Sequence, residues 1–465
     1  MYKHLLILKY LRKRRIAWVS LIAVMLCTTM VLVVISVMGG WLRMFRESFH
    51  SISGDVIVEG QSMLGFPYYE EMIQRIEGLP EVKAAAPVIR SFGLVNIALY
   101  GQSRILAGVS VIGYPANISE VNGFGESLYR MKGDKEISFG LVPGVDYKAP
   151  PGFNPRGKNP KTWDGMIVGS GVIGLKKDRN GNITNRDTDA IYQASVVLTV
   201  MPLQPKQASL DITSKTVNFY WIVDDSRTKV HLYDSNTVYV AFKTLQRDLQ
   251  MDGSDGQPAR TRDIQIALKP GADLAVARQK IREVADAVTA EHGYDIHFPY
   301  EVKTWEETHA QFLNAVENEK SLVTFLFSII SVVAIFLIFC IFYMIVVEKT
   351  KDIGIIKSVG ATSSGVAGIF LGYGAAIGVV GAGLGLLVGY LIVHNINWLH
   401  STLAELTGRE IWKSDVYLFD TIPNTMNPNE VAVILIVAII SSIIGALVPA
   451  IRAARMQPVE ALRWE

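Results

Sequence analysis

Cysteine is scarce in this sequence, and its scarcity excludes two kinds of protein. Only Cys27 and Cys340 occur, and each lies inside a long apolar run. Two separated thiols cannot form the disulfide framework of a small secreted domain, and no C-x-x-C spacing provides a zinc or redox motif. We expect both cysteines to behave as small, buried apolar side chains.

A strong net charge and the common catalytic motifs are also missing. The formal net charge is +2, so the composition gives no sign of a nucleic-acid partner. No G-x-x-x-x-G-K-S/T loop occurs, so we do not expect the chain to hydrolyse ATP by that route, and the G-x-S-x-G and H-E-x-x-H motifs are absent as well. The eight histidines are scattered. We therefore predict no metal site.

The chain is instead rich in long apolar runs, and half of its residues are hydrophobic. A hydrocarbon core of about 30 Å takes about 20 helical residues to cross. Four runs without Asp, Glu, Lys or Arg meet that length: 16–42, 321–347, 363–393 and 431–451. The first is much longer than the apolar region of a signal peptide, so we expect an uncleaved anchor. The predicted fold class is an α-helical membrane protein, with one spanning helix before and three after a large polar segment.

Lysine and arginine are unevenly distributed around these runs. Six lie in 1–15, three in 348–357 and three in 452–465, whereas 394–430 contains two against five acidic residues. Cytoplasmic loops of membrane proteins carry the excess of Lys and Arg. We therefore expect both termini and the short link to be cytoplasmic, with 1–15 as an amphipathic segment. The segments 43–320 and 394–430 are then external.

The segment 43–320 has the composition of a soluble domain. Strand–helix–strand patterns occur near both of its ends. The expected elements are strands at 55–59, 82–88 and 93–98 around a helix at 68–77, and strands at 263–268 and 294–298 around a helix at 273–290. We expect these units to assemble into one α/β lobe.

A β-rich stretch separates the two ends. Residues 143–190 are rich in Gly, Pro, Lys, Asp and Asn and predict a loop. Short strands are predicted at 194–200, 217–223 and 237–240. We expect a second, β-rich lobe inserted in the first at about 113–245, which makes the external segment an α+β domain of two lobes.

The third apolar run carries glycines at helical spacing, among them Gly378, Gly381, Gly385 and Gly389. In lipid, small residues at every fourth position let helix backbones approach closely. Simple bundle packing explains the pattern. A helix that slides during a working cycle is a compatible second interpretation.

The link at 348–362 is charged at its start and then amphipathic, with Ile353, Ile356 and Val359 at helical spacing. Such a segment can dock into a groove on a cytoplasmic partner. It can equally lie on the lipid surface as an interfacial helix. The residues alone do not decide between these two.

Aromatic residues recur at the end of the first run, where Trp41, Phe45 and Phe49 follow one another at every fourth position. An aromatic belt at the membrane surface is the simpler explanation. The sharper hypothesis is an apolar lip for a lipid substrate, formed by Met38, Trp41, Phe45, Phe312 and Val316.

Two segments resemble the signatures of a known family. EKTKDIGIIKSVGAT at 348–362 resembles the signature that follows the second helix of FtsX/MacB-type (type VII) ABC transporter permeases, and PAIRAARMQPVEALR at 449–463 resembles their C-terminal signature. The resemblance implies a one-plus-three helix layout with a MacB-like, porter-type α/β lobe. It also implies a separate ATPase chain, which holds the ATP and Mg²⁺. The present chain would then be non-catalytic and have no cofactor of its own. The contact with the ATPase chain would be made by Glu348, Lys351, Asp352, Ile353, Ile356, Lys357 and Gly360.

Within this family the sequence is most similar to the lipoprotein-releasing (Lol) permeases. The similar segments are ISVMGGW at 35–41, the stretch from VKTW to EK at 302–320, and SDVYLFDTIP at 414–423. The resemblance implies a bacterial inner-membrane complex of two permease subunits, identical or different, with two LolD-like ATPase chains. Such a complex lifts lipid-anchored proteins out of the membrane toward a periplasmic carrier, whose docking loop has a counterpart here near 202–216.

Two other functions stay open at this point. One is MacB-like export of drugs, toxins or peptides, although MacB usually carries its ATPase on the same chain. The other is FtsX-like signalling to a cell-wall hydrolase, for which the external segment is large.

Overall fold

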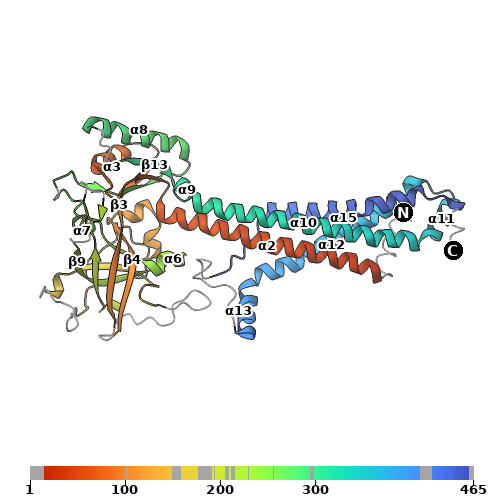
Figure 1. The fold of residues 1–465 in the computed structure, drawn as a ribbon, viewed down its shortest axis with the longest axis horizontal. Helices are drawn as coiled ribbons and strands as arrows, with labels where there is room; N and C mark the ends of the chain where they lie inside the picture. The colour runs from red at the N-terminus through yellow and green to blue at the C-terminus, as the bar shows by residue number, and fades with distance from the viewer. Residues whose placement is uncertain are drawn as a thin grey trace. The chain divides into compact units, whose positions relative to one another are not determined.

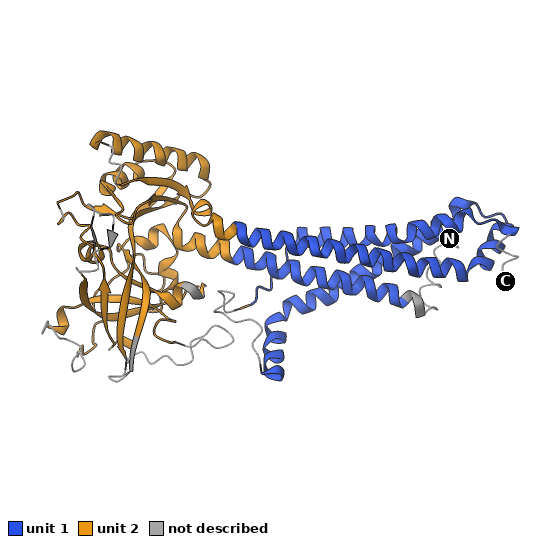
Figure 2. Cartoon of the chain, in the orientation of Figure 1, with its two compact units in different colours: residues 1–44, 314–411, 422–465 blue, residues 45–313, 412–421 orange. Residues whose placement is uncertain are grey.

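The computed structural model describes residues 15–99, 103–148, 159–175, 191–192, 194–204, 209–210, 215–228, 230–254, 256–293, 298–408 and 421–459. The chain forms two compact units, coloured separately in Figure 2. The helical unit comprises Met1–Met44, Asn314–Ile411 and Ile422–Glu465, and the sheet unit comprises Phe45–Leu313 and Trp412–Thr421. The predicted 1–15 segment lies outside the described residues, apart from Arg15.

Among the described residues, four helices are long and apolar enough to cross a membrane, as the sequence predicts. They are α2 (Arg15–Ser53), α10 (Ala310–Glu348), α12 (Ser363–His394) and α15 (Pro428–Arg455), all labelled in Figure 1. Helices α12 and α15 keep close to their predicted limits. Helices α2 and α10 extend beyond theirs, because the polar flanks of both runs continue the helix into residues of the sheet unit.

Two segments and one cysteine differ in detail from the sequence predictions. The helix in the 348–362 link is α11 (Thr350–Ser358), and the 394–430 segment, predicted as a loop, contains α13 (Ile396–Thr407). Cys340 is exposed on α10 and Cys27 is only half-buried, so the prediction that both thiols are buried is wrong. A membrane-spanning surface is apolar on the outside, so an exposed thiol on α10 needs no protein neighbour.

A nine-stranded sheet forms the centre of the sheet unit, counted over the described part of the chain. Its order is β13 (Tyr300–Thr304), β1 (Val56–Gly60), β12 (Asp263–Leu268), β3 (Val82–Leu99), β4 (Ser103–Tyr114), β10 (Thr237–Ala241), β5 (Asp164–Gly169), β9 (Thr216–Ser226) and β6 (Ser195–Val200). Strands from both ends of the segment alternate at one side of the sheet, which confirms the α/β lobe assembled from two halves. The predicted strand at 294–298 falls mostly outside the described residues. Strand β13, a little later in the chain, pairs with β1 on the side opposite β12.

The two predicted strands at 82–88 and 93–98 are one long strand, β3. Its first part pairs with β12, and its second part pairs with both β4 and β6. At Gly93, an added Cβ would lie 3.0 Å from atoms of Leu198, Thr199 and Val111, so glycine allows β6 to approach there. The β-rich part therefore shares β3 and β4 with the α/β part, and it includes residues earlier in the chain than the predicted insertion at 113.

Strand β5 lies inside the 143–190 segment, so the prediction of a loop there is wrong for Asp164–Gly169. The strand pairs with β10 and β9, and five of its six residues are buried. Its apolar centre is only Met166, Ile167 and Val168, which is too short for an alternation pattern to stand out among Gly and Asp.

Helices α3 (Tyr69–Glu77) and α8 (Leu274–His292) occur where the sequence predicts them. Asp273 caps α8, since its carboxylate accepts hydrogen bonds from the backbone N–H groups of Ala275 and Val276. Both helices bury one apolar face in the core that also contains β1, β3 and β12. Near 202–216, β7 (Leu203–Gln204) and β8 (Ser209–Leu210) form a two-stranded ribbon.

Candidate functional site

The glycines of α12 lie at close contacts with two other helices of the helical unit. An added Cβ at Gly381 would lie 2.9 Å from Val24 Cβ, and one at Gly385 would lie 2.9 Å from the Met25 carbonyl oxygen, both on α2. On the other side, an added Cβ at Gly378 would lie 2.9 Å from Ser442 Cβ on α15. Cβ contacts under about 3 Å do not occur in unstrained packing, so these three positions exclude any larger residue.

Further contacts extend the same arrangement. Thr29 donates a hydrogen bond from Oγ1 to the Gly385 carbonyl oxygen at 3.1 Å, which is a polar contact between α2 and α12. Gly389 is looser, with its nearest neighbour atom, Leu32 Cβ, at 3.5 Å. Gly374, which the sequence does not single out from its neighbours, would place an added Cβ 2.6 Å from Ala446 Cβ. The four predicted packing glycines are thus divided between α15 and α2.

Helix α11 turns one of its predicted docking residues inward. Ile353 is 4% exposed and packs with Val346, Val366 and Ala453. Ile356 is half-buried, whereas Ile355 and Val359 are 53% and 84% exposed. The apolar surface that the link presents is therefore formed by Ile355 and Val359, and the interpretation of Ile353 as an outward-facing residue is wrong.

Charged residues fix the orientation of this link. Lys357 donates hydrogen bonds from Nζ to the carbonyl oxygens of Ala454 and Met456, at 2.8 and 2.7 Å, and so joins α11 to the end of α15. Lys349 forms an ion pair with Asp352. Gly360 has a φ of +102°, a conformation that favours glycine, and it ends the link before Thr362 caps α12. Glu348 and Lys351 are exposed.

The residues of the hypothetical lip divide between the units, with Met38, Trp41 and Val316 in the helical unit and Phe45 and Phe312 in the sheet unit. Val316 is 4% exposed, and Met38 and Trp41 are half-buried. The rings of Phe45 and Phe312 are 4.5 Å apart, and Phe45 is fully buried. Phe49 is 7% exposed and stacks on His309 at 4.4 Å. Phe45 and Phe49 therefore do not form the exposed aromatic belt that the sequence suggests.

His309 is held neutral within this aromatic cluster of the sheet unit. Burial lowers the pKa of its imidazole to about 4, and the positive charge of Arg90 acts in the same direction. Its Nε2 lies 3.0 Å from Ser53 Oγ, with which it shares a hydrogen bond. A neutral imidazole can both accept this bond and stack on Phe49, whereas protonation would place a charge against apolar rings.

We expect acid to destabilise the sheet unit through His309. The pKa in the folded chain lies below the ordinary value of 6.5, so the stabilising contribution is intact above that value and is lost as the pH falls toward 4. At pH 5 the loss is about 2 kcal/mol. Thermal unfolding of the wild type and of His309→Gln between pH 7.5 and 5 measures it. Equal pH dependence in both proteins would contradict the assignment.

The comparisons with known proteins agree with this architecture. Residues 324–458 match the family model "FtsX-like permease C-terminal". This chain carries an FtsX-like permease domain. Two transmembrane proteins LolC of lipoprotein-releasing systems are similar over nearly their full length: that of Xylella fastidiosa Temecula1 at 24% identity and that of Neisseria meningitidis at 25%, each covering 98% of both chains.

Other matches cover part of the chain. The transmembrane protein LolE of Haemophilus influenzae is 30% identical over 26% of this chain and 29% of its own length. Among solved structures, the periplasmic region of MacB from Actinobacillus actinomycetemcomitans matches with 9% identity and a TM-score of 0.31, covering 58% of this chain and 98% of that chain. The chain is homologous to the LolC and LolE transmembrane proteins, which confirms the resemblance given by the 348–362 and 449–463 segments.

Sequence reasoning missed one pair of charged residues in the helical unit. Lys320 of α10 and Glu430 of α15 form an ion pair at 2.8 Å, and an added Cβ at Gly39 of α2 would lie 3.2 Å from Glu430 Oε2. One sequence signal could have indicated it. Lys320 and Glu430 each immediately precede an apolar run, and Gly39-Gly40 lie near the C-terminal end of the first run. Flanking charges are common at membrane surfaces, so this signal alone did not predict a pair.

Proposed function

We propose that this chain is the permease subunit of an ABC transporter that releases lipoproteins from a bacterial inner membrane. The observation that carries the proposal is the end-to-end similarity to LolC, which spans the helical unit and the sheet unit together. The chain itself would be non-catalytic, and a separate ATPase chain would bind ATP and Mg²⁺. A second permease subunit would complete the membrane part.

In this proposal, the ATPase moves the membrane helices of the permease. The ATPase would dock on the α10–α11–α12 link through Ile355 and Val359, with Lys351 setting the docking register. Because α11 is joined to α15 through Lys357, movement of the link would reach three helices of the bundle together. Release then requires that the ATP-bound ATPase favour one of two bundle conformations over the other.

The proposal fixes the orientation of the chain in the membrane. We expect reporters fused after Glu465 or within 350–356 to be cytoplasmic, and reporters within 150–190 or 400–425 to be periplasmic. The Lys and Arg distribution gives the reason. Paired alkaline phosphatase and fluorescent protein fusions measure it, and a periplasmic C-terminus would contradict the proposal.

Purification of the native complex through a tag on this chain tests the function against its rivals. A LolD-like ATPase together with a lipoprotein-binding periplasmic carrier supports lipoprotein release. An outer-membrane channel in place of the carrier would indicate MacB-like export, and a cell-wall hydrolase would indicate FtsX-like signalling.

A further inference from the structure

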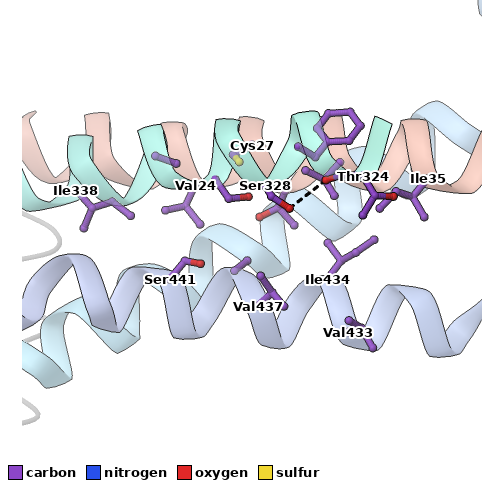
Figure 3. A pocket seen from close by; sticks show the side chains of 16 residues that line it. Val24, Cys27, Ile35, Thr324, Ser328, Ile338, Val433, Ile434, Val437 and Ser441 are labelled. Atoms are coloured by element: carbon purple, nitrogen blue, oxygen red, sulfur yellow. Dashed lines mark hydrogen bonds between the residues drawn. The ribbon is translucent and has the colours of Figure 1, made fainter. Parts of the chain in front are cut away.

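The helical unit contains a cavity of about 220 Å³ between α2, α10 and α15. Figure 3 shows the side chains that line it, which come from all three helices. None of the described residues that line it is charged. The cavity is larger than an apolar cavity of about 150 Å³ that stays free of water and binds benzene in another protein.

The hydroxyl groups in the walls do not make this cavity hydrophilic. Thr324 and Ser328 donate their hydroxyl protons to the carbonyl oxygens of Lys320 and Thr324, within their own helix. Thr28 differs from these two residues, because it is 2% exposed and its Oγ1 has no hydrogen-bond partner among the described residues. Cys27, Ser331 and Ser441 also line the space, but ten of its sixteen lining residues are aliphatic or aromatic, such as Val31, Phe327 and Val437. It therefore suits an apolar ligand better than a chain of waters.

One end of the cavity has a polar boundary. Ile35, Thr324 and Ile434 line that end, and each lies four residues, or about one helical turn, from Gly39, Lys320 and Glu430 respectively. Those three residues meet at the Lys320–Glu430 ion pair, whose side chains are 29% and 31% exposed. An apolar cavity that ends at an ion pair matches an amphiphile with one apolar chain and one polar end.

We propose that this cavity within a single chain binds one acyl chain of a membrane amphiphile, with the polar end of the ligand at Lys320 and Glu430. All three walls belong to helices able to span a membrane, so acyl chains are the apolar groups available around them. The acyl chain can come from a bilayer phospholipid or from a lipoprotein. The second source rests on the proposed function, and the first does not.

Photocrosslinking tests the proposal with two probes. The full chain is reconstituted in nanodiscs with its ATPase and permease partners. One sample contains phosphatidylethanolamine with a mid-chain diazirine, and the other contains a triacylated lipopeptide with the same group. After illumination, mass spectrometry compares adducts on the cavity residues Phe327 and Ile338, which are 7% and 1% exposed, with adducts on two exposed residues of the same helix. These are Phe325 and Phe336, which are 65% and 63% exposed on α10.

The matched variants are Ala438→Phe, which fills the cavity from α15, and Ala432→Phe, which adds the same ring at an exposed position of that helix. We expect Ala438→Phe to lower the cavity adducts about tenfold and leave those at Phe325 unchanged. Ala432→Phe should change neither. Ala334→Met, on the facing wall of α10, provides a second filled cavity if the first variant does not fold.

Adducts at the cavity from either probe support the site, and the probe that gives them identifies the source of the acyl chain. Wild-type adducts confined to the exposed residues would overturn the proposal, as would cavity adducts that both filled variants retain. Lipoprotein release is measured on the same samples. Loss of release with cavity adducts intact would count against the proposed function and not against the acyl-chain site.

Discussion

Replacing Gly385 by leucine is expected to prevent the helical unit from assembling. An added Cβ would meet Thr28 Cβ at 2.8 Å and the Met25 carbonyl oxygen at 2.9 Å. The second contact is with helix backbone, which cannot turn away as a flexible side chain can. Overpacking of this kind costs about 3 kcal/mol, and in lipid it also removes the close helix contact that drives association. The Thr29 hydrogen bond to the Gly385 carbonyl oxygen would be lost with it.

Gly383 provides the matched control for this prediction. It lies on the same helix, is exposed, and would have no atom within 4 Å of an added Cβ. The yield of monodisperse protein and its thermal unfolding in detergent compare the two variants. We expect Gly383→Leu to behave as the wild type and Gly385→Leu to aggregate. Similar yields of both variants would mean that α2 and α12 do not depend on this contact.

Changing Ile355 to aspartate is expected to abolish association with the proposed ATPase partner while leaving the chain folded. The side chain is 53% exposed, so the free chain loses little, but a docked ATPase would bury an unpaired carboxylate. That burial costs several kcal/mol, and a loss of about 3 kcal/mol lowers affinity by a factor of about 100 or more. Co-purification with the ATPase subunit measures the effect, and ATP hydrolysis by the complex measures its consequence.

Two further variants separate docking from folding. Ile355→Leu keeps an apolar side chain at the same position and should retain the ATPase. Ile353→Asp places a charge in the cluster formed by Val346, Val366 and Ala453, so it should unfold the end of the bundle itself. If Ile355→Asp still binds the ATPase normally, α11 is an interfacial helix on the lipid surface, which is the alternative that the sequence left open.

The membrane helices could be predicted from the sequence because an apolar run of about 20 residues without charge rarely occurs in a soluble domain. The sheet was harder for specific reasons. Gly93 interrupts the apolar alternation of β3, although in the structure it lets β6 approach the strand. Strand β5 is short and lies among loop-forming residues, and only its pairing with β10 and β9 reveals it.

The sequence predicts where the link at 348–362 lies, but not which of its apolar side chains face outward. The periodicity of 348–362 indicates an amphipathic helix, but it cannot tell which apolar residues the chain keeps for its own core. Ile353 is buried and Ile355 is exposed. This difference arises because Ile353 packs against Val366 and Ala453, which belong to other helices. The cavity between α2, α10 and α15 depends in the same way on three helices whose contacts no single run encodes.

The most direct test of the proposed function is release itself. The chain is reconstituted with the proposed partner permease and ATPase in proteoliposomes that contain a fluorescent triacylated lipoprotein. Transfer to a soluble carrier is followed after ATP is added. We predict transfer that requires ATP hydrolysis, is lost with Ile355→Asp and is retained with Ile355→Leu. A complex that hydrolyses ATP at the wild-type rate yet leaves all of the lipoprotein in the membrane would contradict the proposed function.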